Sequence, residues 1–175
     1  TVLTSSAASD VYKRQVRLYQ EGQPREKLDQ AALKFGMPMG PMELMDMVGL
    51  DICNKVGEEL SLAPKGEGDG DNPLAGLIRQ GKLGKKTGQG FYEWVDGKPK
   101  REDMDFSNTE LTRVGEELLA PLLAEAARAE AEGVVADADH VDAGVIFGTG
   151  FAPFRGGPLH YTKTKDAAGA DQAAA

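Results

Sequence analysis

The longest helical pattern lies between residues 107 and 132. Its apolar residues recur at helical spacing along one stripe, formed by Leu111, Val114, Leu118, Leu119, Leu122, Leu123 and Ala126. Ser107 and Glu110 have the spacing of a capping box, so a helix is expected to begin there and to run to Glu132. Pro121 removes one backbone donor inside this helix, which predicts a kink or a local break.

Shorter helices and one extended segment are expected elsewhere. Pro24 precedes a helix with Leu28, Ala31, Ala32 and Phe35 on one face, and Gly36 is its predicted stop. Further helices are expected from Pro41 to Val48, after a cap at Asp51, and from Pro73 to Gly81. Glycines bound the one convincing extended stretch, Phe91 to Val95. The predicted fold class is therefore mainly α.

Two parts of the chain share an order of features, at an offset of about 111 residues. A helical end followed by glycine occurs at Gly22 and again at Gly133. Leu28-Asp29, Phe35-Gly36, Pro38, Gly40 and Pro41 are then matched by Val141-Asp142, Phe147-Gly148, Pro153, Gly157 and Pro158. Coincidence in a glycine-rich chain is the alternative, but the shared order of five features favours two related helical units.

The repeat also predicts the domain boundaries. The first helical unit is expected over residues 16–105 and the second over residues 106–165. A first-unit helix as long as the one before Gly133 would begin upstream of residue 1, so the first unit is expected to be truncated at its start and the second at its end. Residues 1–15 lack periodicity and are interpreted as non-native or disordered, and residues 166–175 as a disordered tail.

Composition narrows the possible functions. The chain has 175 residues and a net charge of -8, which is enough for one ordinary domain or two small ones and disfavours binding to nucleic acid. Since it has no apolar run of about 18 residues, no membrane span is expected. One cysteine, Cys53, and two histidines cannot easily form a zinc site, so no metal is predicted, and the single cysteine favours a reducing, cytoplasmic compartment.

The sequence does not contain a complete motif for binding a phosphate or a dinucleotide. Gly81 to Gly88 resembles a phosphate-binding loop, but Lys85 stands where the motif requires glycine. No stretch reads Gly-x-Gly-x-x-Gly after a strand, so no NAD-binding residue is predicted in this chain.

The segment from Arg79 to Arg101 has seven basic and two acidic residues, a local charge of +5. A solvated turn is the favoured interpretation, and attraction of an anionic ligand or a partner domain is the alternative.

The Met-rich turn from Met37 to Met42 has two interpretations. Its thioethers could line a pliable apolar pocket of the kind that an acyl chain occupies, or they could fill the core beside a tight interhelical turn. Glu43 and Asp46 are predicted to form an exposed polar face rather than an acid/base pair. His140 and His160 are predicted to be surface or capping residues, and no catalytic residue is assigned.

Two long blocks of sequence resemble a known family. Residues 35–51 and 81–92 are similar to the C-terminal domain of 3-hydroxyacyl-CoA dehydrogenases. Residues 132–139 and 147–158 resemble the tandem helical domain in the multifunctional α subunits of fatty acid β-oxidation complexes. The resemblance implies an NAD-dependent oxidation of L-3-hydroxyacyl-CoA, in which NAD and the catalytic His/Glu pair belong to a preceding Rossmann domain.

The resemblance also implies a role for the helical part. It implies an acyl-CoA substrate, a Rossmann domain as partner, and a homodimer or larger complex in lipid metabolism. Among the residues of this chain it points to Phe35, Met37, Pro38 and Met39 as lining the substrate cleft. The alternative is a non-catalytic helical dimerisation or scaffold module. A 3-hydroxybutyryl-CoA dehydrogenase is disfavoured, because such enzymes ordinarily end near the first unit.

Overall fold

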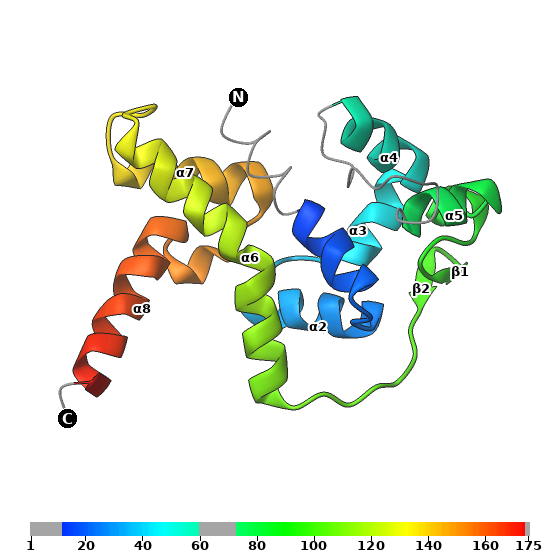
Figure 1. Cartoon of the computed structure of the whole chain (residues 1–175), viewed down its shortest axis with the longest axis horizontal. Helices are drawn as coiled ribbons and strands as arrows, with labels where there is room; N and C mark the ends of the chain where they lie inside the picture. The colour runs from blue at the N-terminus through cyan, green and yellow to red at the C-terminus, as the bar shows by residue number, and fades with distance from the viewer. Residues whose placement is uncertain (1–11, 60–72, 174–175) are drawn as a thin grey trace.

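The computed structural model of the chain describes residues 12–59 and 73–173, and this part is mainly helical (Figure 1). A first helical segment covers residues 12–20. The helices that follow are α2 (Arg25–Phe35), α3 (Pro41–Val48), α4 (Leu50–Glu59), α5 (Pro73–Arg79), α6 (Asn108–Ala131), α7 (Ala138–Thr149) and α8 (Pro158–Ala173). Two single 3₁₀ turns, η1 (Lys85–Thr87) and η2 (Pro153–Arg155), lie in the connections. The predicted mainly α class is confirmed.

A short antiparallel hairpin stands where the sequence predicted one extended segment. Strand β1 (Glu93–Val95) pairs with β2 (Lys98–Lys100), with Glu93 opposite Lys100. Asp96 and Gly97 both have positive φ, +50° and +75°, as a two-residue hairpin turn requires. The predicted segment is wrong at its start, because Phe91 and Tyr92 lie buried before the strand.

Helix α6 begins as the sequence predicts. The Ser107 side chain accepts a hydrogen bond from the Glu110 N–H at 3.2 Å, and the Glu110 carboxylate accepts one from the Ser107 N–H at 3.2 Å. Both halves of a capping box are therefore formed. Pro121 lies inside the helix, which is continuous from Asn108 to Ala131, so no break occurs. Figure 1 shows α6 bending between its two halves, in agreement with the predicted kink.

The same type of helix junction occurs once in each of the two helical units. Asp29 of α2 accepts hydrogen bonds from the backbone N–H groups of Met42 and Glu43, in the first turn of α3. Asp142 of α7 accepts them from Leu159 and His160, in the first turn of α8. The order of a helix, a carboxylate-bearing helix and a capped helix is thus the same in both halves, which confirms the two related units.

Glycine stands before each capped helix for the same steric reason. A Cβ atom on Gly40 would overlap the Asp29 side chain, and a Cβ atom on Gly157 would overlap that of Asp142. Each aspartate therefore lies directly against the backbone that it caps. The glycines at these two repeat positions are required by this close approach.

One detail of the predicted repeat is wrong. Phe35 is 5% exposed whereas Phe147 is 89% exposed, so the two are not equivalent. The left-handed cap of α2 is Gly36, seven residues after Asp29, and that of α7 is Gly150, eight residues after Asp142. Phe35 comes six residues after Asp29, but Phe147 comes only five residues after Asp142, and one residue corresponds to about 100° around a helix, which directs Phe147 to solvent.

The ends of the described chain differ from the predicted boundaries. The first helical segment begins by residue 12, inside the segment interpreted as non-native, while residues 1–11 lie outside the described part. Helix α8 continues to Ala173, beyond the predicted end of the second unit at residue 165. The origin of residues 1–15 and the boundary at residue 105 stay predictions.

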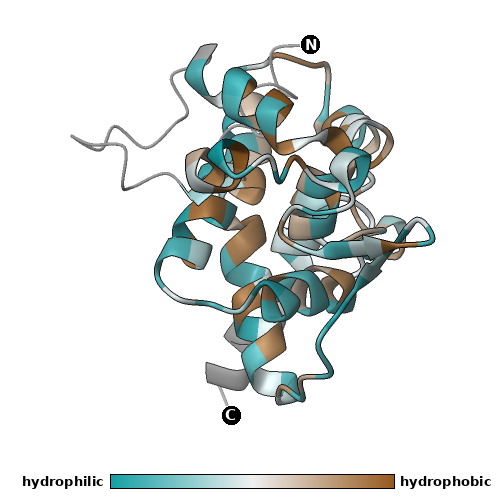
Figure 2. Ribbon diagram, turned by 90° about the vertical axis from the view of Figure 1, so that its right-hand side faces the viewer, coloured by the Kyte–Doolittle hydropathy of each residue, from teal (hydrophilic) through white to brown (hydrophobic). Residues whose placement is uncertain are grey.

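The core joins the two units. Helix α2 packs against α6, and Gly115 permits the approach, since a Cβ atom there would lie 2.9 Å from the Ala31 carbonyl oxygen. Arg14 and Glu117, 2.5 Å apart, also connect the first helical segment with α6. Figure 2 shows hydrophobic residues concentrated on the helix faces that pack together. One continuous hydrophobic cluster therefore includes buried residues from both units.

Candidate functional site

An apolar pocket of about 400 Å³ lies between the two helical units. Its size falls in the range of small-molecule sites, which are mostly apolar. The first unit contributes the Met-rich turn and neighbouring helices, and the second contributes α6 and the end of α7. The lining residues are Tyr12, Gln15, Ala32, Met37, Met39, Pro41, Leu44, Met45, Val48, Cys53, Leu118, Leu119, Leu122, Gly148 and Thr149.

The turn between α2 and α3 directs two methionines toward this pocket. Gly36 ends α2 with φ +111°, a conformation that a residue with a Cβ atom rarely adopts. The N–H of Met37 then donates to the Ala32 carbonyl at 3.0 Å, and Pro41 starts α3. This tight connection brings Met37 and Met39 to the pocket wall.

The other two predicted substrate residues lie elsewhere. Phe35 does not line the pocket and packs edge-on against Phe151 and Tyr161, with ring centroids 5.6 and 5.1 Å away. Pro38 is exposed and lies against Gly150, where a Cβ atom would come within 3.0 Å of the proline ring. The structure thus brings Met37 and Met39 together, while Phe35 and Pro38 contact the second unit.

Sequence reasoning missed the wall formed by the second unit. Leu118, Leu119 and Leu122 were recognised only as the apolar stripe of a helix, and Thr149 carried no signal. The stripe shows that the leucines are turned inward, but not which cavity they border. Only the packing of α6 on α2 brings them to the same pocket as the Met-rich turn.

Asp46 is buried, which corrects the predicted exposed polar face. Its side chain is 0% exposed and accepts hydrogen bonds from the backbone N–H groups of Phe91 and Tyr92, at 2.8 and 2.9 Å, and from the Trp94 indole at 3.0 Å. Glu43 is also mostly covered and pairs with Arg101. These carboxylates attach the β1–β2 hairpin and the residues on either side of it to α3, so they have a structural role.

Asp29 is the other buried carboxylate of this network. Besides the two N–H groups of α3, it accepts a hydrogen bond from the Tyr92 hydroxyl at 2.8 Å. Burial raises the pKa of Asp29 to about 6, although the three donors act in the opposite direction. Burial also raises the pKa of Tyr92. Because both groups are enclosed and fully engaged, they position α3 rather than transfer protons to a ligand.

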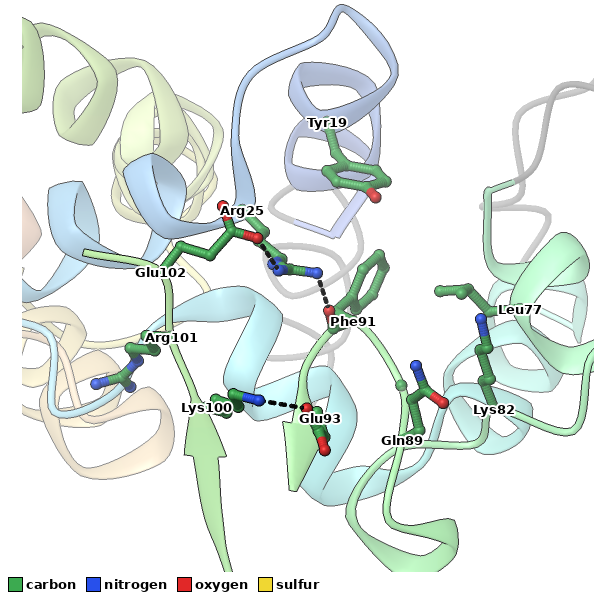
Figure 3. Close-up of a pocket in the computed structure, with 11 residues that line it drawn as sticks. Tyr19, Arg25, Leu77, Lys82, Gln89, Phe91, Glu93, Lys100, Arg101 and Glu102 are labelled. Carbon is green, nitrogen blue, oxygen red and sulfur yellow. Dashed lines mark hydrogen bonds and ion pairs between the residues drawn. The ribbon is translucent and has the colours of Figure 1, made fainter. Parts of the chain in front are cut away.

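The basic segment borders a second, more polar pocket of about 390 Å³. Figure 3 shows Arg25 bridging the Phe91 carbonyl and Glu102, and Lys100 directed at Glu93. Lys86 pairs in the same way with Asp51, at 2.5 Å. Carboxylates from α3, α4 and the β1 region therefore balance much of the local charge, which supports the solvated-turn interpretation. Asp51 forms this pair from inside α4, which begins at Leu50, so its predicted role as the cap is wrong.

The two histidines occupy helix starts. His140 Nδ1 lies 2.7 Å from the Asp137 carboxylate, which also accepts the His140 N–H and so caps α7. This contact raises the pKa of His140. His160 donates its backbone N–H to Asp142. Both histidines are exposed, which confirms the prediction of surface residues. No helix within the described ranges is long and apolar enough to span a bilayer.

Comparison with known proteins decides the family. The profile of the 3-hydroxyacyl-CoA dehydrogenase C-terminal domain matches residues 4–94, more than half of the chain. The chain belongs to this family. The matched range contains the Met-rich turn, Asp29, Asp46 and the segment that Asp46 binds. It also begins inside residues 1–15, the segment interpreted as non-native.

The relatives extend the similarity to the second unit. The fatty acid oxidation complex subunit alpha of Shewanella halifaxensis is 37% identical over 163 residues, covering 87% of this chain and 23% of the relative. The subunit of the same name from Vibrio cholerae is 38% identical over 154 residues, covering 82% and 22%. The chain therefore spans less than a quarter of the length of these relatives.

A solved structure supports the same relationship. The dehydrogenase part of multifunctional enzyme 1 from C. elegans superposes with a TM-score of 0.59 at 26% identity, covering 82% of this chain and 35% of that one. The expected resemblance to helical dehydrogenase domains of multifunctional enzymes is thus confirmed by sequence and by fold.

Proposed function

We propose that the chain is the substrate-binding and dimerisation part of an NAD-dependent L-3-hydroxyacyl-CoA dehydrogenase of cytoplasmic fatty acid β-oxidation. The observation that carries this proposal is the apolar pocket at Met37 and Met39, inside the region matched to the family. An acyl chain in this pocket gains about 0.8 kcal/mol for each buried methylene group. Methionine suits chains of varied shape, because its side chain is flexible and polarizable.

The described residues do not fit NAD. A dinucleotide site requires a strand that leads through a glycine-rich turn into a helix, and the sheet in this part of the chain is the β1–β2 hairpin. The proposal therefore gives this chain the tasks of holding the acyl chain and excluding water. The Rossmann domain of the parent enzyme supplies NAD and the acid/base residues.

Calorimetric titration with acyl-CoA tests the proposal on this chain. Hexadecanoyl-CoA is expected to bind more tightly than butyryl-CoA or free CoA, since only the long chain fills the pocket. Met39→Ala is expected to weaken binding of the long chain. Met47→Ala is the matched control, because Met47 lies on α3 but is 46% exposed and does not line the pocket. Equal affinity of the unsubstituted chain for all three ligands would contradict the proposal.

A non-catalytic dimerisation module is the second candidate. It is favoured by exposed apolar side chains on α3 and α4, each 44–51% exposed: Leu44, Met47, Val48, Ile52 and Val56. Sedimentation equilibrium tests it, with Ile52→Lys expected to dissociate a dimer formed through this face. A dimer without acyl-CoA binding would favour the scaffold role over the dehydrogenase role.

A further inference from the structure

The loop of the second unit from Gly150 to Arg155 contacts the Met-rich turn of the first. The Arg155 Nε donates a hydrogen bond to the Phe35 carbonyl at 2.7 Å, and the guanidinium lies 4.2 Å from the centroid of the Phe35 ring. Since Phe35 is the last residue of α2, Arg155 binds the helix end from which the turn departs.

The same loop also covers the turn itself. A Cβ atom on Gly36 would lie 2.5 Å from the Phe154 ring and 2.8 Å from the Ala152 methyl, so both side chains rest on that glycine. Gly150 in turn lies against Pro38. Contacts on both sides of Met37 therefore fix the turn against the second unit.

The end of α7 forms part of the wall of the same pocket. Thr149 lines the pocket, and its hydroxyl donates to the Val145 carbonyl at 2.8 Å within α7. Since this bond satisfies the hydroxyl, the methyl group is the part of the side chain suited to an apolar ligand. Leu118, Leu119 and Leu122 continue the same wall along α6.

We propose that the second helical unit sets the longest acyl chain that the pocket accepts. Thr149 acts as a size limit at the pocket wall, and Phe154 and Arg155 are positioning residues that hold the Met-rich turn in place beside it. The inference rests on the proposed function, because it specifies how the same pocket selects among acyl chains.

The test is the chain-length profile of binding, measured by calorimetry with butyryl-, octanoyl-, dodecanoyl- and hexadecanoyl-CoA. Thr149→Leu is expected to lower the affinity for the longest ligand by about fourfold for each methylene it excludes, and to leave that for butyryl-CoA unchanged. Thr149→Ser keeps the hydroxyl and removes one methyl, so it is expected to shift the profile toward longer chains. A profile unchanged in both variants overturns the size limit.

Two phenylalanines of the second unit test the positioning role. Phe154→Ala is expected to weaken the binding of hexadecanoyl-CoA about twofold or more relative to the binding of butyryl-CoA, because the aromatic ring that packs on Gly36 is removed from the Met-rich turn. Phe147→Ala is the control, since Phe147 is also highly exposed but its side chain does not line the pocket. Phe154 is 75% exposed, so its removal takes little from the core.

The outcomes separate the two proposals. If the unsubstituted chain prefers long acyl chains but none of these variants alters the preference, the second unit does not set chain length and the proposed function stands. If the unsubstituted chain shows no such preference, both proposals fail. Equal loss of affinity for every ligand in Thr149→Leu and in Phe154→Ala indicates a merely structural role and also overturns the inference.

Discussion

Replacing Asp29 by asparagine tests the buried carboxylate that joins α2, α3 and Tyr92. The carboxylate has three donors, the N–H groups of Met42 and Glu43 and the Tyr92 hydroxyl. Asparagine keeps the shape but offers one acceptor oxygen, so its NH₂ group must face a donor. One backbone N–H of α3 is then left without an acceptor, which costs about 1–3 kcal/mol.

The size of the effect depends on pH. The pKa of Asp29 is raised from 3.8 to about 6 by burial, so the folded protein retains this proton where the unfolded chain has lost it. The stability of the protein with Asp29 therefore falls as pH rises between these two values, by up to about 3 kcal/mol for roughly two pKa units. The Asp29→Asn variant lacks this titration, so its disadvantage should be largest near about pH 4 and smallest at about pH 7.

Urea unfolding at both pH values measures the difference. Far-UV circular dichroism follows the helices, and an unchanged m-value verifies that the variant unfolds from a similarly compact state. Asp142→Asn is the matched variant, since Asp142 accepts the corresponding pair of N–H groups in the second unit, and it measures the cost of losing one such bond. A stability difference between wild type and Asp29→Asn that is constant or grows from about pH 4 to pH 7 would refute the reasoning.

Three further predictions concern single positions and the cofactor. Gly40→Ala is expected to lower the free energy of unfolding several times more than an ordinary surface substitution does, because the added Cβ atom overlaps Asp29. Gly76→Ala, whose added Cβ atom has nothing within 4 Å, should raise it by up to about 1 kcal/mol, and thermal unfolding measures both variants. Ser107→Ala should lower the free energy of unfolding by about 1 kcal/mol through loss of the capping box, and an effect below a few tenths would contradict this. Calorimetry is expected to detect no micromolar NAD binding by this chain, and a clear isotherm would refute that expectation.

Local signals in the sequence determined most of the helices. Ser107 and Glu110 fixed the start of α6 through a capping box of four residues, and Gly36 fixed the end of α2 through its own backbone conformation. The repeat could be read for the same reason, since each unit carries its own aspartate and its own glycine before the capped helix. A difference of one residue between the Asp29–Phe35 and Asp142–Phe147 spacings was enough to misplace Phe147, because each residue turns a helical side chain by about 100°.

The tertiary structure decided which side chains meet. Asp46 reads as a polar residue on an amphipathic helix, and its burial is favourable because the N–H groups of Phe91 and Tyr92 and the Trp94 indole, 45 to 48 residues away, donate to it. Phe35 and Met37 are two residues apart, but Phe35 binds Arg155, 120 residues away, whereas Met37 lines the pocket. Helix starts and ends are set by hydrogen bonds within a few residues, which a sequence displays directly. Pocket walls and the hydrogen-bond partners of buried charges come from segments that are distant in the sequence. These segments pack closely together only when the chain has folded.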